Sequence, residues 1–171
     1  MTLEEERLKV YETVGRAISN WGALEVVLAM LFSVLVSKQR VNPNALAVFL
    51  SIENFRSKLQ VIDAVFQQPG IDKKIKNNWD TALSHIKARQ KKRNRLAHHD
   101  ILIDYEAKEM HRVKVIPPFA NPINRIKMDN GTERPLCLKD LQDANAEFTK
   151  VRQEVLELTA LLDTPAPLQK K

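Results

Sequence analysis

The N-terminal stretch from Leu3 to Ser37 contains no proline, and its apolar residues recur every three or four positions. Apolar residues at this spacing form one stripe along a helix, so the stretch predicts a single long helix. Between Ala23 and Val36 the sequence is apolar nearly all round, which is typical of a central bundle helix or of one that also faces a second subunit. We therefore expect a helical protein and, from this apolar run, a homodimer.

The surroundings of that helix favour a cytoplasmic protein without membrane spans. The apolar run is shorter than the ~20 residues that a membrane helix requires, and it contains Glu25. The first residues are acidic and lack the basic segment and apolar run of a signal peptide. A lone Cys137 excludes internal disulfides and cysteine-rich zinc patterns, and the four histidines have no HExxH-type spacing. We expect neither a metal nor a cofactor.

Caps and stops divide the rest of the chain into further helices. Asn42-Pro43 offers a cap followed by a first-turn proline, which predicts a short helix through Phe49. Ser51 is the expected cap of the next helix, which Pro69-Gly70 stops, and Asp72 is the expected cap of the one after it. The four main helices are predicted near residues 3–37, 52–67, 73–97 and 138–162.

The segment before the last helix has a different pattern. Residues 101–103, 113–116 and 125–128 are short and β-prone, and turn residues such as Asp129-Asn130-Gly131 separate them from their neighbours. We predict a mainly all-α bundle of four main helices, with one short helix and a small β-hairpin insertion. One domain covers residues 1–163, and residues 164–171, with two prolines, form a disordered tail.

Positive charge gathers in one part of the third main helix. Lysine and arginine outnumber aspartate and glutamate by 27 to 21, giving a net charge of +6, which favours an anionic partner. Besides Arg93, five lysine and arginine residues between positions 87 and 95 form this basic cluster, which can attract phosphate backbones. Most runs of this kind, however, only form a helix face exposed to solvent. With 6% aromatic residues, Trp21 and Trp79 being expected in the core, selectivity for base sequence should be weak. The expected RNA-binding residues are Lys87, Arg89, Lys91, Lys92 and Arg95.

Two charged residues fall on apolar stripes. Positions seven apart lie about 20° from each other on a helix, so Arg93, seven after Ile86, continues a core-facing stripe. Glu25, seven after Ile18, does the same in the first helix. Either the two residues pair with each other, because unpaired buried charge is costly, or both sit at stripe edges where long side chains reach solvent.

The helix that ends near residue 97 also places three polar side chains close in sequence. Asn94 and His98 are four apart and share one face, whereas Arg93 is turned from His98 by about 140° if the helix is continuous. For Arg93 to reach the imidazole, either the helix ends near Ala97 or the long arginine side chain bends back.

This segment, Arg93-Asn94-Arg95-Leu96-Ala97-His98, resembles the active-site motif of the HEPN superfamily: an arginine, usually a polar residue such as asparagine, then a few residues and a histidine. The layout of helices between residues 3 and 162 is also similar to that family. The chain departs from those members that have a tyrosine close behind the histidine, which nucleotidyltransferase partners modify, since Tyr105 is too far away.

The resemblance implies metal-independent RNA cleavage in which the 2′-hydroxyl of the RNA is the nucleophile. In that reaction His98 transfers protons, Arg93 stabilises the charged phosphate of the transition state, and Asn94 orients the phosphate or the imidazole. Glu25 is expected to support Arg93. Members of the family commonly form homodimers that share one cleft, and the resemblance suggests a toxin or phage-defence effector with an antitoxin or nucleotidyltransferase-like partner.

Two other functions compete with this one. The same fold can be a non-catalytic module for dimerisation, partner binding or RNA binding, in which Arg93 only closes an ion pair with Glu25. The basic helix can instead bind a phosphate or nucleotide, although the chain has four glycines and no glycine-rich phosphate loop.

Overall fold

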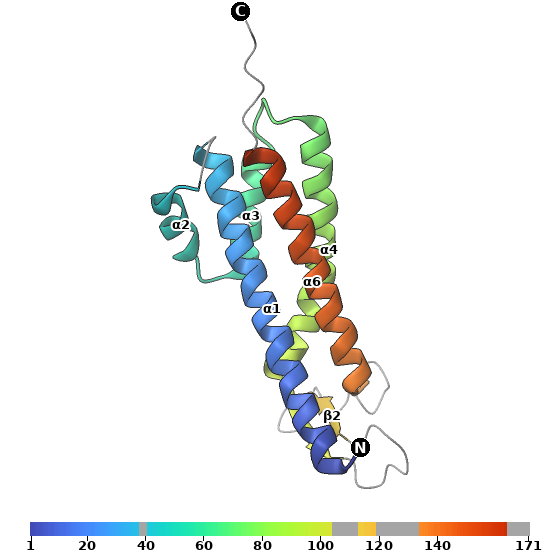
Figure 1. Cartoon of the computed structure of the whole chain (residues 1–171). Coiled ribbons are helices and arrows are strands. Elements are labelled where there is room, and N and C mark those ends of the chain that lie inside the picture. Colours follow the sequence, from blue (N-terminus) through green and yellow to red (C-terminus); the bar gives the residue numbers. More distant parts are fainter. Residues whose placement is uncertain (38–40, 104–112, 119–133, 164–171) are drawn as a thin grey trace, which may run out of the picture. The chain divides into compact units, whose positions relative to one another are not determined.

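The computed structural model describes residues 1–37, 41–103, 113–118 and 134–163. Within these residues the chain is mainly helical, with five helices and one two-stranded antiparallel sheet (Figure 1). The mainly helical fold class is therefore confirmed, while the HEPN arrangement of the helices stays a prediction. The elements are α1 (Leu3–Ser37), α2 (Pro43–Leu50), α3 (Phe55–Phe66), α4 (Lys73–His98), β1 (Asp100–Ile103), β2 (Val113–Ile116) and α6 (Leu138–Asp163).

The chain groups into two compact units, and each is built from two separate stretches of sequence. The first unit comprises Met1–Trp21 and Ala88–Thr149, and the second comprises Gly22–Lys87 and Lys150–Lys171. Helices α1, α4 and α6 contribute residues to both units. The single domain over residues 1–163 stays a prediction, and the expected tail at 164–171 lies outside the described residues.

Side-chain caps explain where two helices begin. The Asn42 side chain accepts hydrogen bonds from two backbone N–H groups of α2, and Pro43 is its first residue. Oδ1 of Asp72 likewise accepts from the backbone N–H groups of Lys74 and Ile75, at 2.8 and 3.2 Å. These bonds satisfy donors that the first turn of a helix leaves free, so both predicted caps are confirmed.

The predicted cap of α3 is wrong. Asn54, three residues after the expected Ser51, accepts from the backbone N–H groups of Arg56 and Ser57. Ser51 instead ends α2, where its hydroxyl donates to the carbonyl of Val48 at 2.7 Å. Serine and asparagine are both good caps, and the sequence offers both within four residues, so the stripe pattern alone did not decide between them.

The core of the second unit is built around pairs of aromatic rings. Phe32 of α1 lies 5.2 Å from Phe49 of α2, and Phe66 of α3 stacks on Trp79 of α4 at 5.0 Å, measured between ring centroids. The indole N–H of Trp79 donates to Asp63 at 3.0 Å. Trp79 is fully buried, which confirms the prediction that it is a core residue.

The first unit combines helix packing with the small sheet. Trp21 of α1 is buried and contacts Phe148 of α6 edge to face, with ring centroids 5.1 Å apart. Strands β1 and β2 pair antiparallel from Asp100 opposite Ile116 to Ile103 opposite Val113. Two of the three β-prone segments therefore form the predicted hairpin strands. The third, at 125–128, and the turn at 129–131 lie outside the described residues.

Helix α1 includes a window long and apolar enough to cross a membrane, and half of that window is buried inside the protein. Within the predicted apolar run, Leu24, Leu28 and Leu31 are fully buried. Only Val26 and Val36 in this run are large apolar side chains that remain exposed, at 55% and 44%. The chain itself therefore covers most of the apolar surface from which the sequence predicted a second subunit. The homodimer stays a prediction that now rests on the family resemblance.

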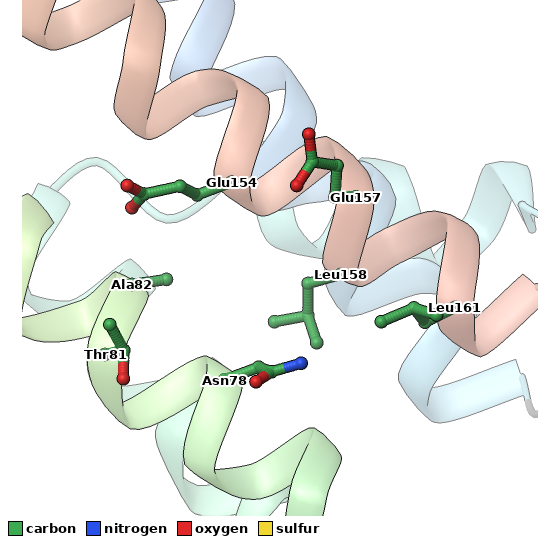
Figure 2. Close-up of a pocket in the computed structure, with 7 residues that line it drawn as sticks. All are labelled: Asn78, Thr81, Ala82, Glu154, Glu157, Leu158 and Leu161. Carbon is green, nitrogen blue, oxygen red and sulfur yellow. The ribbon is translucent and has the colours of Figure 1, made fainter.

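The second unit also contains a cavity of about 310 Å³ between α4 and α6 (Figure 2). Its two carboxylates have partners on the protein: Glu154 contacts Nδ1 of His85 at 2.8 Å, and Glu157 accepts from Gln153 at 3.1 Å. Among the described residues, no lysine or arginine lines it. The lining residues are Asn78, Thr81, Ala82, Glu154, Glu157, Leu158 and Leu161.

Candidate functional site

The predicted motif lies in the last turns of α4. The helix runs without a break to His98, and strand β1 begins two residues later at Asp100. Leu96, within the motif, is buried and anchors this end of the helix in the first unit. Because α4 continues through Ala97, Arg93 and His98 are turned from each other by about 140° around its axis. The helix thus ends one residue after the predicted end near Ala97, and it is continuous from Arg93 to His98.

Asn94 and His98 lie together on the exposed face of α4. Both side chains are exposed, and they are one turn apart, as positions i and i+4. Lys91 is exposed on the same face, three residues before Asn94. No hydrogen bond or ion pair of His98 occurs among the described residues. An imidazole in this position is open to solvent, so a substrate can reach it.

Arg93 is half-buried and interacts with its neighbour in the motif. Its Nη1 donates to Oδ1 of Asn94 at 3.2 Å. Its Nε is buried and has no hydrogen-bond partner within the described part of the chain. The arginine is thus positioned by packing and by Asn94, and its guanidinium keeps unused donors, which is what binding of an oxyanion requires.

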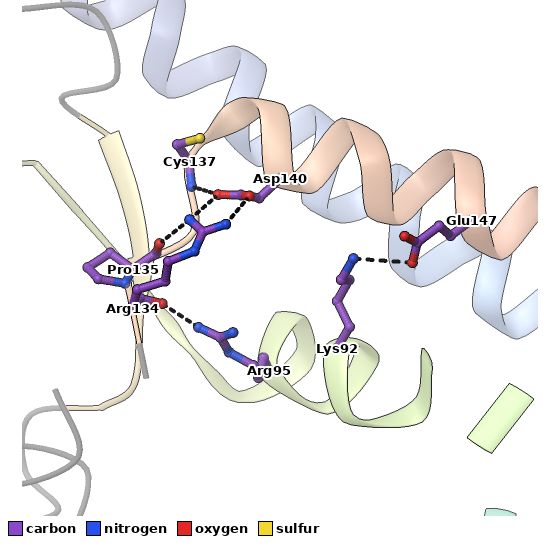
Figure 3. A network of polar contacts seen from close by, with 7 residues as sticks. All are labelled: Lys92, Arg95, Arg134, Pro135, Cys137, Asp140 and Glu147. Carbon is purple, nitrogen blue, oxygen red and sulfur yellow. Dashed lines mark hydrogen bonds and ion pairs between the residues drawn. The ribbon is translucent and has the colours of Figure 1, made fainter. Parts of the chain in front are cut away.

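The basic cluster divides into engaged and free side chains, and Figure 3 shows two of the engaged ones, Lys92 and Arg95. Glu147 of α6 binds Lys92 at 3.1 Å and lies 3.9 Å from Nε of Arg89. Arg95 donates to the backbone carbonyl of Arg134 at 2.5 Å. Three of the five predicted RNA-binding residues therefore use their charge or donors inside the first unit.

The remaining two lysines of the cluster are exposed. Lys91 belongs to the first unit and Lys87 to the second, and neither has a partner among the residues that the structure describes. An exposed ammonium without a carboxylate partner can bind an incoming phosphate without first breaking an ion pair. Among the described residues, Lys91 is a free cation on the face of Asn94 and His98, one turn of the helix before Asn94.

A second polar network holds the start of α6 (Figure 3). Asp140 accepts from both Nη atoms of Arg134, at 2.6 and 3.0 Å, and from the backbone N–H of Cys137 at 2.9 Å. The hydrogen bonds from Arg134 hold the pKa of Asp140 far below its ordinary value, although burial opposes this shift. The same interaction raises the pKa of Arg134.

Sequence reasoning missed this network, although part of its signal was present. Asp140 is the third residue of a helix that begins at Leu138, and an acidic side chain there accepts from the residue that caps the helix. Nothing in the sequence indicated that Arg134 would clamp the carboxylate. Through the bond from Arg95 to the Arg134 carbonyl, the network connects the end of α4 with the start of α6.

Glu25, the expected support of Arg93, has another partner. Its carboxylate binds Nζ of Lys58 at 3.0 Å within the second unit, where the two side chains are 24% and 9% exposed. Nζ of Lys58 also lies 6.0 Å from the ring centroid of Phe49. Because Lys58 is the partner of Glu25, the cost of an unpaired Glu25 no longer indicates that Arg93 pairs with it. Lys58 follows Phe55 by three on the buried stripe of α3, which was the missed signal.

In the described ranges, no three His, Cys, Asp or Glu side chains come together as potential ligands of a metal ion. Comparison of the chain with protein-family models, with curated proteins and with solved structures finds no match.

Proposed function

We propose that this protein is a metal-independent endoribonuclease of the HEPN type that acts in the cytoplasm, as a toxin or phage-defence effector. The observation that best supports this is the state of His98: exposed, without a partner in the described residues, and on one helix face with Asn94 and Lys91. A buried or salt-bridged histidine would favour a structural role. An antitoxin or nucleotidyltransferase-like partner belongs to this proposal.

The proposed reaction uses the nucleophile of the RNA itself. A histidine takes the proton of the 2′-hydroxyl, the 2′-oxygen attacks the adjacent phosphorus, and the bond to the 5′-oxygen breaks as that oxygen receives a proton. The products are a 2′,3′-cyclic phosphate and a 5′-hydroxyl. Arg93 stabilises the extra negative charge on the phosphate, Asn94 orients Arg93 through their hydrogen bond, and Lys91 attracts the strand.

One imidazole cannot be base and acid at the same moment, so the proposal includes a second copy of the chain. In one copy the continuous helix turns Arg93 away from His98. Two copies that face each other supply two imidazoles, one to remove a proton and one to donate a proton. A protein that is monomeric in light scattering at micromolar concentration, while it cleaves RNA, would contradict this shared site.

The experiment that tests the proposal compares matched single-stranded oligonucleotides. One is RNA, and the other has a single 2′-deoxy nucleotide at the main cleavage position. We expect cleavage of the RNA in EDTA, products that end in a 2′,3′-cyclic phosphate, and no cut at the 2′-deoxy position. Cleavage of both oligonucleotides at that position, or complete dependence on an added metal, would exclude attack by the 2′-oxygen.

The three engaged residues of the basic cluster favour one alternative, a non-catalytic helical module for partner or RNA binding. In it, Arg89, Lys92 and Arg95 only fasten α4 to Glu147 and Arg134. This alternative predicts salt-dependent RNA binding without any cleavage. The same oligonucleotides, analysed for binding and for product, distinguish the two functions.

A further inference from the structure

A small polar pocket of about 140 Å³ lies between α1 and α6 in the first unit. It is separate in sequence from the motif at the end of α4. Pockets for whole small molecules usually measure about 300–1,000 Å³, so this one has room for a single chemical group. Its lining residues are Lys9, Glu12, Thr13, Arg16, Gln142 and Asn145.

The pocket is rich in free hydrogen-bond donors. Nζ of Lys9 and the side-chain amide of Gln142 have no partner among the described residues, and both side chains are exposed. Arg16 pairs with Glu12, the one acidic residue of the lining, which occupies only part of the guanidinium. The pocket therefore has a net charge of +1 from two cations and one carboxylate.

A neighbouring network fixes the orientation of Asn145. Asn20 donates from its Nδ2 to Oδ1 of Asn145 at 2.5 Å, and also contacts the hydroxyl of Thr149 at 3.4 Å. With its oxygen occupied, Asn145 keeps its N–H₂ group for another acceptor. Thr13 has already used its proton, since its hydroxyl donates to the carbonyl of Lys9 at 2.7 Å. The hydrogen-bonding groups of the pocket that remain unused among the described residues are thus mainly donors.

We propose that this pocket binds a phosphate group. A phosphate offers several oxygens in different directions, so it can accept from Lys9 and Arg16 of one helix and from Gln142 and Asn145 of the other at the same time. A carboxylate has only two oxygens for donors on two helices. The phosphate comes either from the backbone of a nucleic acid strand or from a free phosphate ion, and only the first source rests on the proposed function.

The test is a nuclear magnetic resonance titration of the whole chain, following the side-chain amides of Gln142 and Asn145. The first arm adds inorganic phosphate, with chloride at matched ionic strength as reference. The second arm adds a single-stranded 2′-O-methyl oligonucleotide, which the proposed reaction cannot cleave. We expect saturable shifts of both amides in at least one arm, and none with chloride.

Variants decide whether the shifts come from this pocket. Lys9→Gln should weaken the binding by about tenfold, since a hydrogen bond from a charged donor is lost. Lys139→Gln, an exposed lysine of α6 outside the pocket, is the matched control and should bind as the parent does.

The two arms of the titration distinguish a nucleic acid backbone from a free phosphate ion. They also test the phosphate pocket separately from the proposed ribonuclease activity. Shifts with the oligonucleotide identify a nucleic acid backbone as the ligand, and shifts with phosphate alone identify the free ion. If neither arm shifts the amides, or if Lys9→Gln binds as tightly as the parent, the phosphate pocket is overturned. The ribonuclease proposal would survive that result, because its test is cleavage and not occupancy of this pocket.

Discussion

The two units bury charge in different ways. In the second unit, Nζ of the buried Lys58 has a carboxylate partner, Glu25, and an aromatic neighbour. In the first unit, the buried carboxylate of Glu6 accepts one long hydrogen bond, 3.4 Å from the backbone N–H of Val113, in the part of the chain that is described. The buried cation of the second unit is therefore paired with a carboxylate, whereas the buried carboxylate of the first unit has no cationic partner among the described residues.

The cavities of the two units also differ in the charge of the residues that line them. Two carboxylates and, among the described residues, no cation line the cavity of the second unit. Two cations, one carboxylate and two amide side chains line the pocket of the first unit. The first unit also contains the exposed Asn94, His98 and Lys91. We infer that the second unit mainly contributes stability and that an anionic partner binds the first.

The largest expected effect on stability is in the aromatic core of the second unit. Trp79→Ala removes the ring stacked on Phe66 and should lower the free energy of unfolding by about 3–5 kcal/mol, because it leaves a large cavity. Urea unfolding followed by circular dichroism measures this. Trp79→Phe keeps an aromatic ring and should cost less. If the alanine variant is as stable as the phenylalanine variant, the stacked pair is not central to the core.

The ion pair of the second unit should matter more than an exposed pair. Glu25→Gln leaves the ammonium of Lys58 without a charged partner, and we expect a loss of about 1–3 kcal/mol, since solvent still reaches part of the carboxylate. The control is Glu4→Gln, which breaks the exposed pair with Arg7 and should cost at most about 0.5 kcal/mol. Equal costs in urea unfolding would mean that burial adds nothing to the Glu25–Lys58 pair.

A smaller and pH-dependent effect is expected in the first unit. Asp140→Asn removes a carboxylate that caps α6 and binds Arg134, which should cost about 1 kcal/mol at pH 7. The pKa of Asp140 is lowered in the folded state, so its contribution is complete above the ordinary aspartate pKa of about 3.9. This contribution to stability is lost as the pH falls from about 3.9 toward the lower pKa that Asp140 has in the folded state.

The two tryptophans make this prediction measurable for the first unit. In a Trp79→Phe background, the fluorescence of Trp21 reports on the first unit. The stability difference between the protein with Asp140 intact and its Asp140→Asn variant should be constant from about pH 7 to about pH 5 and shrink below about pH 4. A difference that persists unchanged at about pH 2 would show that the charge of Asp140 does not contribute.

The smallest effect concerns RNA affinity. Lys91→Gln should weaken binding about two- to fivefold and reduce the slope of log affinity against log salt by about 0.7, as expected for one lost phosphate contact on a single strand. Lys92→Gln should change both quantities less, because Glu147 already binds this lysine. The opposite order would show that Glu147 releases Lys92 to the RNA.

The sequence predicted the helices well because stripes and caps are local. The bounds of α1 agree with the prediction, and the caps Asn42 and Asp72 are where they were expected. The error at α3 arose because Ser51 and Asn54 are both able to cap, and only the surrounding packing chooses between them.

The site was less predictable because it depends on contacts between distant segments. Stripe positions indicated that Glu25 needs a partner, but the choice of Lys58 is set by how α1 and α3 pack. The basic run was visible, yet its division into engaged and free side chains depends on Glu147 and Arg134, which are more than 35 residues away in the sequence.

The most direct test of the central claim compares two histidines, one in each unit. Single-turnover cleavage of a single-stranded RNA in EDTA should slow by about 10²–10⁴-fold in His98→Ala, the range typical of a general acid or base. Its unfolding midpoint should stay unchanged, since His98 is exposed and has no partner among the described residues. His85→Ala, which breaks a contact with Glu154 in the second unit, should cleave at the parental rate once folded. If His98→Ala cleaves RNA as fast as the parent protein, the assignment of the active site to the exposed face of α4 is wrong.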